Sequence, residues 1–256
     1  PSLGAIILSV WSVEAAFYIN ALSFLTVIVA LLFVRTPTPG SPGPEGGTAR
    51  HIKEVLSYAW RNVWARNMLL ALLIASFFGL PFVVLLPSVS RDVLNRGSAG
   101  FGLLMGMVGL GAVLAAPGVT LLNRRFGERE IIKAGFVLVS LLMICFSASR
   151  WLWLSMIICA CLGACALAMS ASINTVLQSR VDRQMRGRVM SLYILVFQGI
   201  FPVGGVVMGF LSDCISTPFA LLVGGSACLA SAVVFAAVPS LLREAVTCTL
   251  PAGKAE

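Results

Sequence analysis

Long uncharged, apolar stretches alternate with short clusters of charged residues along the 256-residue chain. Cutting the sequence at every Asp, Glu, Lys and Arg leaves the stretches 15–34, 67–90, 97–123, 134–149, 151–179, 189–212 and 214–242. A helix needs about 20 mostly apolar residues to cross the hydrocarbon core of a bilayer. The stretch 134–149 reaches that length with Ile131 and Ile132, because Lys133 between them extends its ammonium group to the interface. The pattern predicts an all-α, polytopic membrane protein with about seven spanning helices.

The amino-acid composition excludes the soluble classes of protein. Hydrophobic residues make up 59% of the chain and charged residues only 11%, whereas a soluble domain has about 25% charged residues. We therefore exclude a soluble enzyme and a DNA-binding protein, despite the formal net charge of +8. Residues 1–12 are apolar but too short to span a bilayer, and no initiator methionine precedes Pro1. The sequence is interpreted as a fragment that starts in the last turns of a helix.

The positions of Lys and Arg predict the orientation of the chain in the membrane. Of the 18 basic residues, 15 fall in alternate connections on one side of the bilayer and three fall on the other side. Basic residues concentrate in cytoplasmic loops, so the first side is predicted to be cytoplasmic, and the C-terminus with it. Topology thus accounts for the net charge, and a nucleic-acid partner is not required.

One connection is much longer than the others and divides the chain. Residues 36–47 hold eight Pro or Gly in twelve positions, which excludes regular helix or strand. Apolar residues then recur at helical spacing, so we expect an amphipathic helix that lies in the membrane interface or packs on the protein's own loops. The predicted units are the end of one helix with a complete second helix (1–35), the cytoplasmic linker (36–66), a six-helix bundle (67–238) and a cytoplasmic tail (239–256).

The residues needed for enzyme or cofactor chemistry are missing. His51 is the single histidine, which excludes a Ser-His-Asp triad and multi-histidine metal sites, and no phosphate-binding G-x-x-x-x-G-K-[ST] loop occurs. Cys159, Cys161 and Cys165 form a C-x-C-x-x-x-C cluster without a neighbouring histidine or acid, so we interpret them as packing residues. We expect no enzyme activity, no cofactor and no metal.

Uncharged polar and aromatic side chains within the spans are the candidates for contacting a substrate. No ionisable residue lies in the middle of a stretch, so an acid that couples transport to protons is expected outside this segment. An apolar wall with a few amides suits a bulky organic molecule, while the alternative role of these residues is packing and interhelical hydrogen bonding. The candidates are Phe77, Phe78, Phe82, Ser170, Asn174 and Gln198.

Several segments resemble the C-terminal part of a major facilitator superfamily transporter, of the bacterial exporter type similar to the enterobactin exporter and macrolide-efflux carriers. The most specific is R-G-R-V-M-S-L-Y at 186–193. The resemblance implies a twelve-helix bundle in two halves, of which this chain holds the end of helix five to helix twelve. The N-terminal half of the same protein is then a partner that completes the cavity. The resembling segments are 15–25, 78–94, 99–116, 177–193 and 202–213.

The resemblance also assigns a packing role to prolines and glycines. Pro1 and Gly4 correspond to the end of the antiporter-type G-P-x-x-G-G motif in helix five. A partial repeat of that motif follows in helix eleven. A separate Gly-rich run lies within an apolar helix, where small residues at i, i+4 spacing let helix backbones approach each other. These helix-packing candidates are Pro1, Gly4, Gly102, Gly106, Pro202, Gly204 and Gly205.

Two basic loops are candidates for closing the cytoplasmic side. The first, 120–130, matches the position of the family motif G-x-x-x-D-R-x-G-R-R only in part. Arg125 and Gly127 fit the motif, but Arg124 stands where the aspartate is expected. The resemblance therefore implies a gate at this loop, and the departure puts its ionic lock in doubt.

The second basic loop follows the stretch 151–179, the fifth of the seven apolar stretches. Asp182 lies four residues before Arg186, which is the favourable spacing for an ion pair on a helical turn. Gly187 is expected to end that turn and to free Arg188 to reach the opposite half or a helix C-terminus. The alternative is that these arginines only fix the topology.

The predicted function is the export of small organic molecules, such as drugs or siderophores, from bacterial cells by alternating access. Protons are the expected coupling ion, and the cytoplasmic membrane is the expected location. Two alternatives stay open: a membrane subunit of a pump with a separate ATPase, and a membrane scaffold that transports nothing.

Overall fold

The computed structural model describes residues 13–33, 57–58, 60–181 and 183–237. These described residues are helical apart from short turns and contain no strand. The elements are α2 (Val13–Phe33), α4 (Val63–Ile74), η1 (Ala75–Gly79), α5 (Phe82–Ser88), η2 (Val89–Val93), α6 (Gly97–Phe126), α7 (Glu128–Ala148), α8 (Leu152–Arg180), α9 (Arg183–Ile194), η3 (Leu195–Gly199), α10 (Ile200–Cys214) and α11 (Thr217–Ala237). The all-α prediction is confirmed for this part of the chain.

Five continuous helices among the described residues are long and apolar enough to cross a membrane: Ala65–Val93, Gly97–Phe126, Glu128–Ala148, Leu152–Arg180 and Met185–Cys214. The first combines α4, η1, α5 and η2, and the last combines α9, η3 and α10. The other two predicted spans correspond to α2 and α11, each 21 residues long. The polytopic helical prediction therefore holds, and each predicted apolar stretch coincides with a helix.

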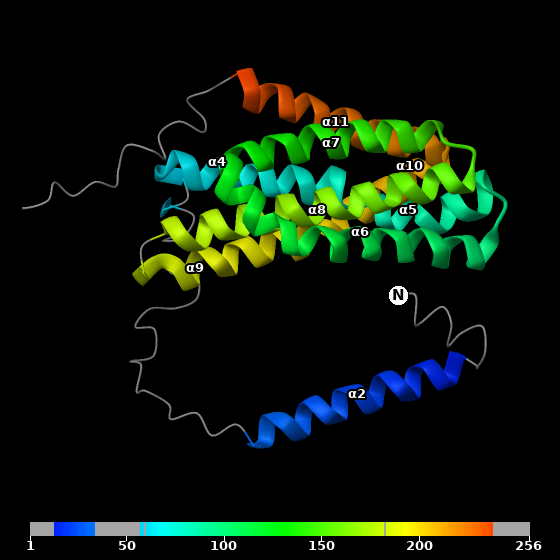
Figure 1. Cartoon of the computed structure of the whole chain (residues 1–256), viewed down its shortest axis with the longest axis horizontal. Coiled ribbons are helices and arrows are strands. Elements are labelled where there is room, and N and C mark those ends of the chain that lie inside the picture. Colours follow the sequence, from blue (N-terminus) through cyan, green and yellow to red (C-terminus); the bar gives the residue numbers. More distant parts are fainter. Residues whose placement is uncertain (1–12, 34–56, 59, 182, 238–256) are drawn as a thin grey trace, which may run out of the picture.

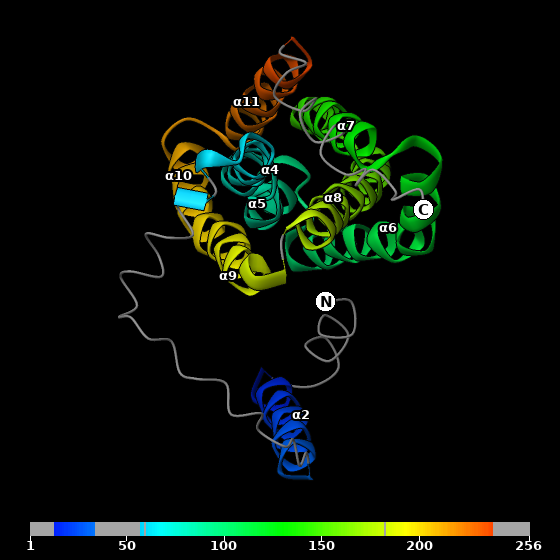
Figure 2. The same ribbon diagram turned by 90° about the vertical axis from the view of Figure 1, so that its left-hand side faces the viewer.

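The helices from α4 to α11 lie side by side in one elongated bundle, whereas α2 lies apart from it (Figures 1 and 2). Seen end-on in Figure 2, α4 and α5 occupy the middle of the bundle, with α10 and α11 on one side and α8 on the other. The large side chains of α2 are exposed along its whole described length, among them Tyr18 and Phe33. Helix α2 is thus apolar without a packing partner in the described structure.

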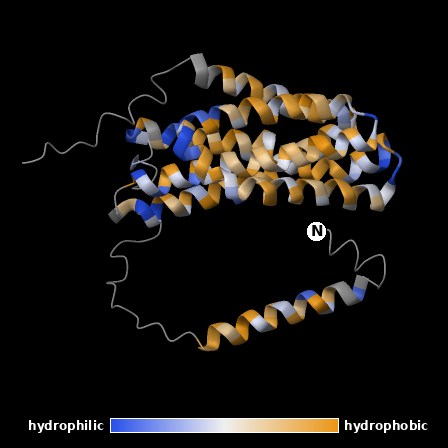
Figure 3. Ribbon diagram, viewed as in Figure 1, coloured by the Kyte–Doolittle hydropathy of each residue, from blue (hydrophilic) through white to orange (hydrophobic). Residues whose placement is uncertain are grey.

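Polar residues gather at the two ends of the bundle, and the helices between them are apolar (Figure 3). We call one of these ends the basic end, because five helices begin or finish there with exposed or half-buried cationic side chains in or next to their last turns. The basic residues described there include Arg61, Arg66, Arg124, Arg125, Arg129, Lys133, Arg180, Arg186 and Arg188. This placement agrees with the alternation of basic connections in the sequence, since consecutive helices run in opposite directions.

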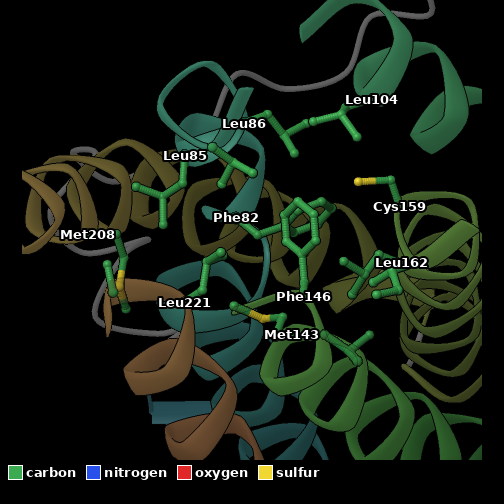
Figure 4. Packing of buried hydrophobic residues seen from close by; sticks show 14 of the residues in the cluster. Phe82, Leu85, Leu86, Leu104, Met143, Phe146, Cys159, Leu162, Met208 and Leu221 are labelled. Carbon is green, nitrogen blue, oxygen red and sulfur yellow. The ribbon is translucent and has the colours of Figure 1, made fainter. Parts of the chain in front are cut away.

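Two buried clusters fill the bundle, one in each half of its length. The cluster near the basic end includes Leu72, Phe136 and Leu177. The other cluster is built around Phe82 and Phe146, whose rings lie among aliphatic side chains and Met143 (Figure 4). Burial of such side chains contributes to helix association in a membrane through van der Waals packing rather than through expulsion of water.

Three segments of the bundle are π-helical, with one extra residue in the turn. In η1 the backbone N–H of Leu80 donates to the carbonyl oxygen of Ala75 at 2.7 Å, and Pro81 follows without an N–H to offer. Segments of this kind are rare and are frequent at functional sites. They interrupt the first and fifth spans of the bundle, which carry the aromatic candidates and Gln198.

Glycines bring several helix backbones into direct contact. A Cβ on Gly111 would overlap the carbonyl of Ala160, and a Cβ on Gly163 would overlap the carbonyl of Val108. In each contact, a glycine of one helix packs against a backbone carbonyl of the other, so the backbones of α6 and α8 approach each other closely. By contrast, a Cβ on Gly109 would meet nothing within 4 Å, so only part of the Gly-rich run faces a neighbouring helix.

Candidate functional site

Two of the aromatic candidates of the first span, Phe77 and Phe78, lie in the π-helical segment η1. The rings of Phe77 and Phe78 are 4.7 Å apart between centroids and inclined at 67°, an edge-to-face arrangement that suits aromatic pairs. Both side chains are half-buried. A Cβ on Gly204 would overlap the carbonyl of Phe77, and one on Gly224 would lie 2.8 Å from the carbonyl of Phe78. The glycines of α10 and α11 therefore allow these two helices to pack directly against the backbone of η1.

The amide candidate Gln198 lies in the second π-helical segment of interest, η3, and its side chain is exposed. Segments η1 and η3 contact each other, so the fold brings the amide and the aromatic candidates of two distant spans into one region. The sequence placed these residues within apolar stretches, and the structure adds that all three lie where the helices depart from α-helical geometry.

An aromatic pair that the sequence analysis did not single out lies directly before Gln198 on the same span. The rings of Tyr193 and Phe197 stack with 5.8 Å between centroids and 6° between planes. Both are half-buried against the core cluster of the basic end. Their i, i+4 spacing beside an amide is the signal that would have identified them.

The polar candidates of α8 form hydrogen bonds along their own helix. The side-chain amide of Gln178 donates to the Asn174 side-chain oxygen at 2.8 Å, as expected for residues that share a face. The Ser170 hydroxyl donates to the carbonyl oxygen of Ala166 at 2.7 Å. These bonds within α8 satisfy part of the hydrogen-bonding capacity of the polar side chains, which lowers the cost of placing them in an apolar environment.

Phe82 differs from the other aromatic candidates, because it belongs to the core. Its side chain is only 2% exposed and is enclosed by Leu85, Leu221 and Phe146 among others (Figure 4). Phe82 is the first residue of α5, which follows the turn after η1, and its side chain lies in the interior of the bundle. The cavity that we propose below therefore does not include Phe82.

At the basic end, Gly127 forms the break between α6 and α7. Its φ of 81° lies in the region that L side chains rarely adopt, so a glycine is required there. Arg124 and Arg125 precede it and are exposed, with the Arg125 guanidinium 5.5 Å from the Phe126 ring centroid. The neighbouring Asn123 accepts a 2.8 Å hydrogen bond from the Ser172 hydroxyl, which joins the last turn of α6 to α8.

The expected helix end at Gly187 is wrong. Helix α9 runs from Arg183 through Gly187 to Ile194, because one interior glycine costs only about 1 kcal/mol of helix stability. The Ser191 hydroxyl also donates to the Gly187 carbonyl at 3.0 Å. Arg186 is exposed and Arg188 is half-buried on this helix.

Some of the predicted residues lie outside the described part of the chain. They are Pro1 and Gly4 of the expected helix-five motif, Asp182 of the expected ion pair, and most of the linker and tail. The described chain resumes with helical residues at 57–58, and α4 begins at Val63. Of the remaining packing candidates, Gly204 and Gly205 are buried, Gly102 and Gly106 are half-buried, and Pro202 is exposed.

Comparison with known proteins identifies the architecture. A family model of the major facilitator superfamily, described as a transmembrane secretion effector, matches residues 1–249. The chain belongs to this family. The chain is therefore a multi-pass membrane protein, in agreement with the spans and with the resemblance found in the sequence.

Two curated relatives are named for multidrug resistance and for multidrug efflux. The multidrug resistance protein MdtG of Enterobacter lignolyticus (strain SCF1) is 25% identical over 213 residues, which are 82% of this chain and 50% of the relative. The multidrug efflux pump Tap of Mycolicibacterium fortuitum is 22% identical over 217 residues, which are 83% of this chain and 53% of the relative. The chain thus spans about half the length of the curated relatives it matches.

Proposed function

We propose that this chain is the C-terminal half of a secondary transporter that exports small organic molecules across the bacterial cytoplasmic membrane by alternating access. The observation that carries the proposal is the family match over nearly the whole chain, together with relatives named for multidrug resistance and efflux. The N-terminal half of the same protein would complete the cavity, and the basic end would face the cytoplasm.

The proposed substrate-facing surface combines Phe77 and Phe78 of η1, the amide of Gln198, and the Ser170–Asn174 face of α8. It offers aromatic faces and uncharged hydrogen-bonding groups. Such a surface binds bulky, partly apolar molecules through contact area and a few polar contacts. The Tyr193–Phe197 pair extends the aromatic part of this surface toward the basic end.

Proton coupling is part of the proposal, but its acid would lie outside the described spans. The described acidic residues all lie within about two turns of a helix end: Glu14, Asp92, Glu128, Glu130 and Asp213. A carboxyl group that takes up and releases protons during transport is expected within the bilayer, facing the cavity. The N-terminal half is therefore the proposed source of the coupling group.

An accumulation assay tests the exporter proposal. Cells that express the natural gene product containing this chain are loaded with fluorescent, bulky organic dyes, with and without a protonophore. We expect lower dye accumulation than in empty-vector cells, and loss of that difference when the protonophore is present. Export that persists without a proton gradient would contradict proton coupling, and equal accumulation of every dye would contradict export of this substrate class.

A further inference from the structure

One hydroxyl group beside the proposed substrate-facing surface is buried without a hydrogen-bond partner. Ser76 is the second residue of η1, and its side chain is 0% exposed. The Ser76 Oγ has no donor or acceptor within hydrogen-bond distance among the described residues. A hydroxyl that is buried in an apolar environment without a hydrogen bond destabilises the conformation that contains it. Ser76 directly precedes Phe77 in η1, so this cost falls at the aromatic pair.

Other buried serines of the spans form the bond that Ser76 lacks. In an α-helix a serine hydroxyl can donate to the carbonyl oxygen four residues earlier. Ser140 is also 0% exposed, and its hydroxyl donates to the Phe136 carbonyl at 2.6 Å. Ser172 and Ser231 each donate to the carbonyl four residues before them, at 2.7 and 2.8 Å. An α-helical environment thus satisfies serine within these spans.

The π-helical geometry of η1 accounts for the missing bond of Ser76. Four residues before Ser76, the carbonyl oxygen of Leu72 is already contacted by the backbone N–H of Ala75. Within η1 the backbone bonds then span five residues, as in the 2.7 Å bond from the Leu80 N–H to the Ala75 carbonyl. The wider turn displaces the side chains of η1 from the α-helical line of carbonyls, and the Ser76 hydroxyl meets no acceptor.

The surroundings of η1 allow its geometry to change. Gly204 and Gly224 face the backbone carbonyls of η1, so neither position has a side chain that interlocks with the segment. Leu80 and Pro81 form a turn between η1 and α5, where an extra residue can be accommodated. Pro81 has no N–H, so lengthening this turn breaks no hydrogen bond donated by Pro81. Segments of π-helix are also frequent at functional sites.

We propose that η1 interconverts between two conformations and that Ser76 sets their balance, an inference that rests on the proposed function. One conformation is the π-helical segment of this structure. In the other, η1 is α-helical and the Ser76 hydroxyl donates to the Leu72 carbonyl. Each α-helical residue turns the chain by about 100°, so removing the extra residue rotates Phe77 and Phe78 relative to α4. Ser76 is therefore a positioning residue, which directs the aromatic pair toward the substrate or away from it.

Fluorine NMR of the purified natural gene product tests this switch without relying on transport. Phe78 is replaced site-specifically by para-fluorophenylalanine, and the areas of its fluorine signals are compared. We expect two signals in slow exchange. Ser76→Ala removes the hydroxyl that favours the α-helical conformation and should change the area ratio about fivefold, which corresponds to about 1 kcal/mol for one hydrogen bond. A single signal, or the same ratio with and without Ser76→Ala, would overturn the proposal.

A second variant fixes the direction of the change. In this structure a Cβ on Gly204 would overlap the carbonyl of Phe77, so Gly204→Ala disfavours the π-helical conformation. We expect Gly204→Ala to shift the area ratio in the direction opposite to that of Ser76→Ala. A shift in the same direction in both variants would contradict the assignment of the two signals to these conformations.

Ser140 provides the matched control, because it is equally buried but its hydroxyl is bonded. Ser140→Ala should lower the melting temperature by a few degrees and leave the ratio of fluorine signals unchanged. Ser76→Ala breaks no hydrogen bond of this structure, so its melting temperature should not fall. An equal fall in both variants would overturn the proposal. Two signals that respond to Ser76→Ala in a protein that exports no dye would contradict the proposed function and not the switch.

Discussion

Gly111 of α6 and Gly163 of α8 pack against each other's helix backbones, so that a Cβ at either position would overlap a main-chain carbonyl of the opposite helix. This reciprocal contact lies near the middle of both helices. Because a bilayer supplies little hydrophobic driving force between helices, close backbone approach is a main source of their association. The two glycines are therefore expected to be necessary for stability.

Gly111→Ala and Gly163→Ala should each lower the stability of the protein by about 1–3 kcal/mol, the usual cost of overpacking. The added methyl group meets a backbone carbonyl, which cannot rotate away as a side chain would. Thermal unfolding of the purified natural gene product in detergent measures the effect. Gly109→Ala is the control, because a Cβ there meets nothing within 4 Å, and its melting temperature should not fall.

The aromatic groups of η1 and η3 should determine affinity for bulky substrates. Phe77→Ala and Phe197→Ala are each expected to raise the substrate concentration for half-maximal efflux about two- to tenfold, since an aromatic contact contributes about 0.5–1.5 kcal/mol. Initial efflux rates over a range of dye concentrations provide the measurement. Phe210→Ala removes an exposed aromatic side chain from the same span and should leave that concentration unchanged; an equal effect of all three variants would argue against a local site.

Arg186 and Arg188 should help to close the basic end when the transporter is open to the opposite side. Arg186→Ala combined with Arg188→Ala removes two charges from α9 while its helix remains. We expect labelling from the cytoplasm of a cysteine introduced at Ser191, after replacement of the exposed natural cysteines, to increase by up to about fivefold. A fivefold change in the population of the open state corresponds to destabilising the closed state by about 1 kcal/mol.

The Arg150→Gln variant controls for the loss of charge at the other end of the bundle. Unchanged labelling and unchanged efflux in the double variant would mean that the two arginines serve only to set topology.

Residues 1–256 alone should not transport. On the proposed architecture, half of the cavity wall is provided by the N-terminal half of the protein, and α2 has an exposed apolar surface that requires further helices. The chain reconstituted into vesicles is expected to insert and to form helices, as circular dichroism would show, but to give no gradient-driven flux of dye. Measurable flux from the inserted chain would contradict the two-half architecture.

The spans were predictable from sequence because membrane helices leave a strong signal. Each apolar stretch between charged residues coincides with a helix, and the strongly basic connections that the structure describes lie at one end of the bundle. Burial within a span was not predictable in the same way. Phe77, Phe78 and Phe82 lie in a segment that is apolar on every side, so periodicity does not reveal that Phe82 enters the core while the others remain half-buried.

The π-helical segments and the course of α9 were also outside the reach of sequence reasoning. A π-helical turn depends on how neighbouring helices pack, as the contact of Gly204 with the Phe77 carbonyl shows. Glycine often follows the end of a helix, which made Gly187 a reasonable candidate for the end of this one. In the structure, α9 continues through Gly187 to Ile194. In the Gly-rich run, likewise, Gly109 and Gly111 are equivalent in sequence and differ only in which one faces α8.

Transport by the purified protein tests the central claim most directly. The natural gene product that contains this chain is reconstituted into sealed vesicles without ATP, and a proton gradient is imposed across the membrane. The account predicts movement of a bulky organic dye against its concentration gradient while the proton gradient lasts, and none after an ionophore collapses it. Absence of dye movement under the proton gradient, or movement only when an ATPase and ATP are added, would contradict the assignment as a secondary exporter.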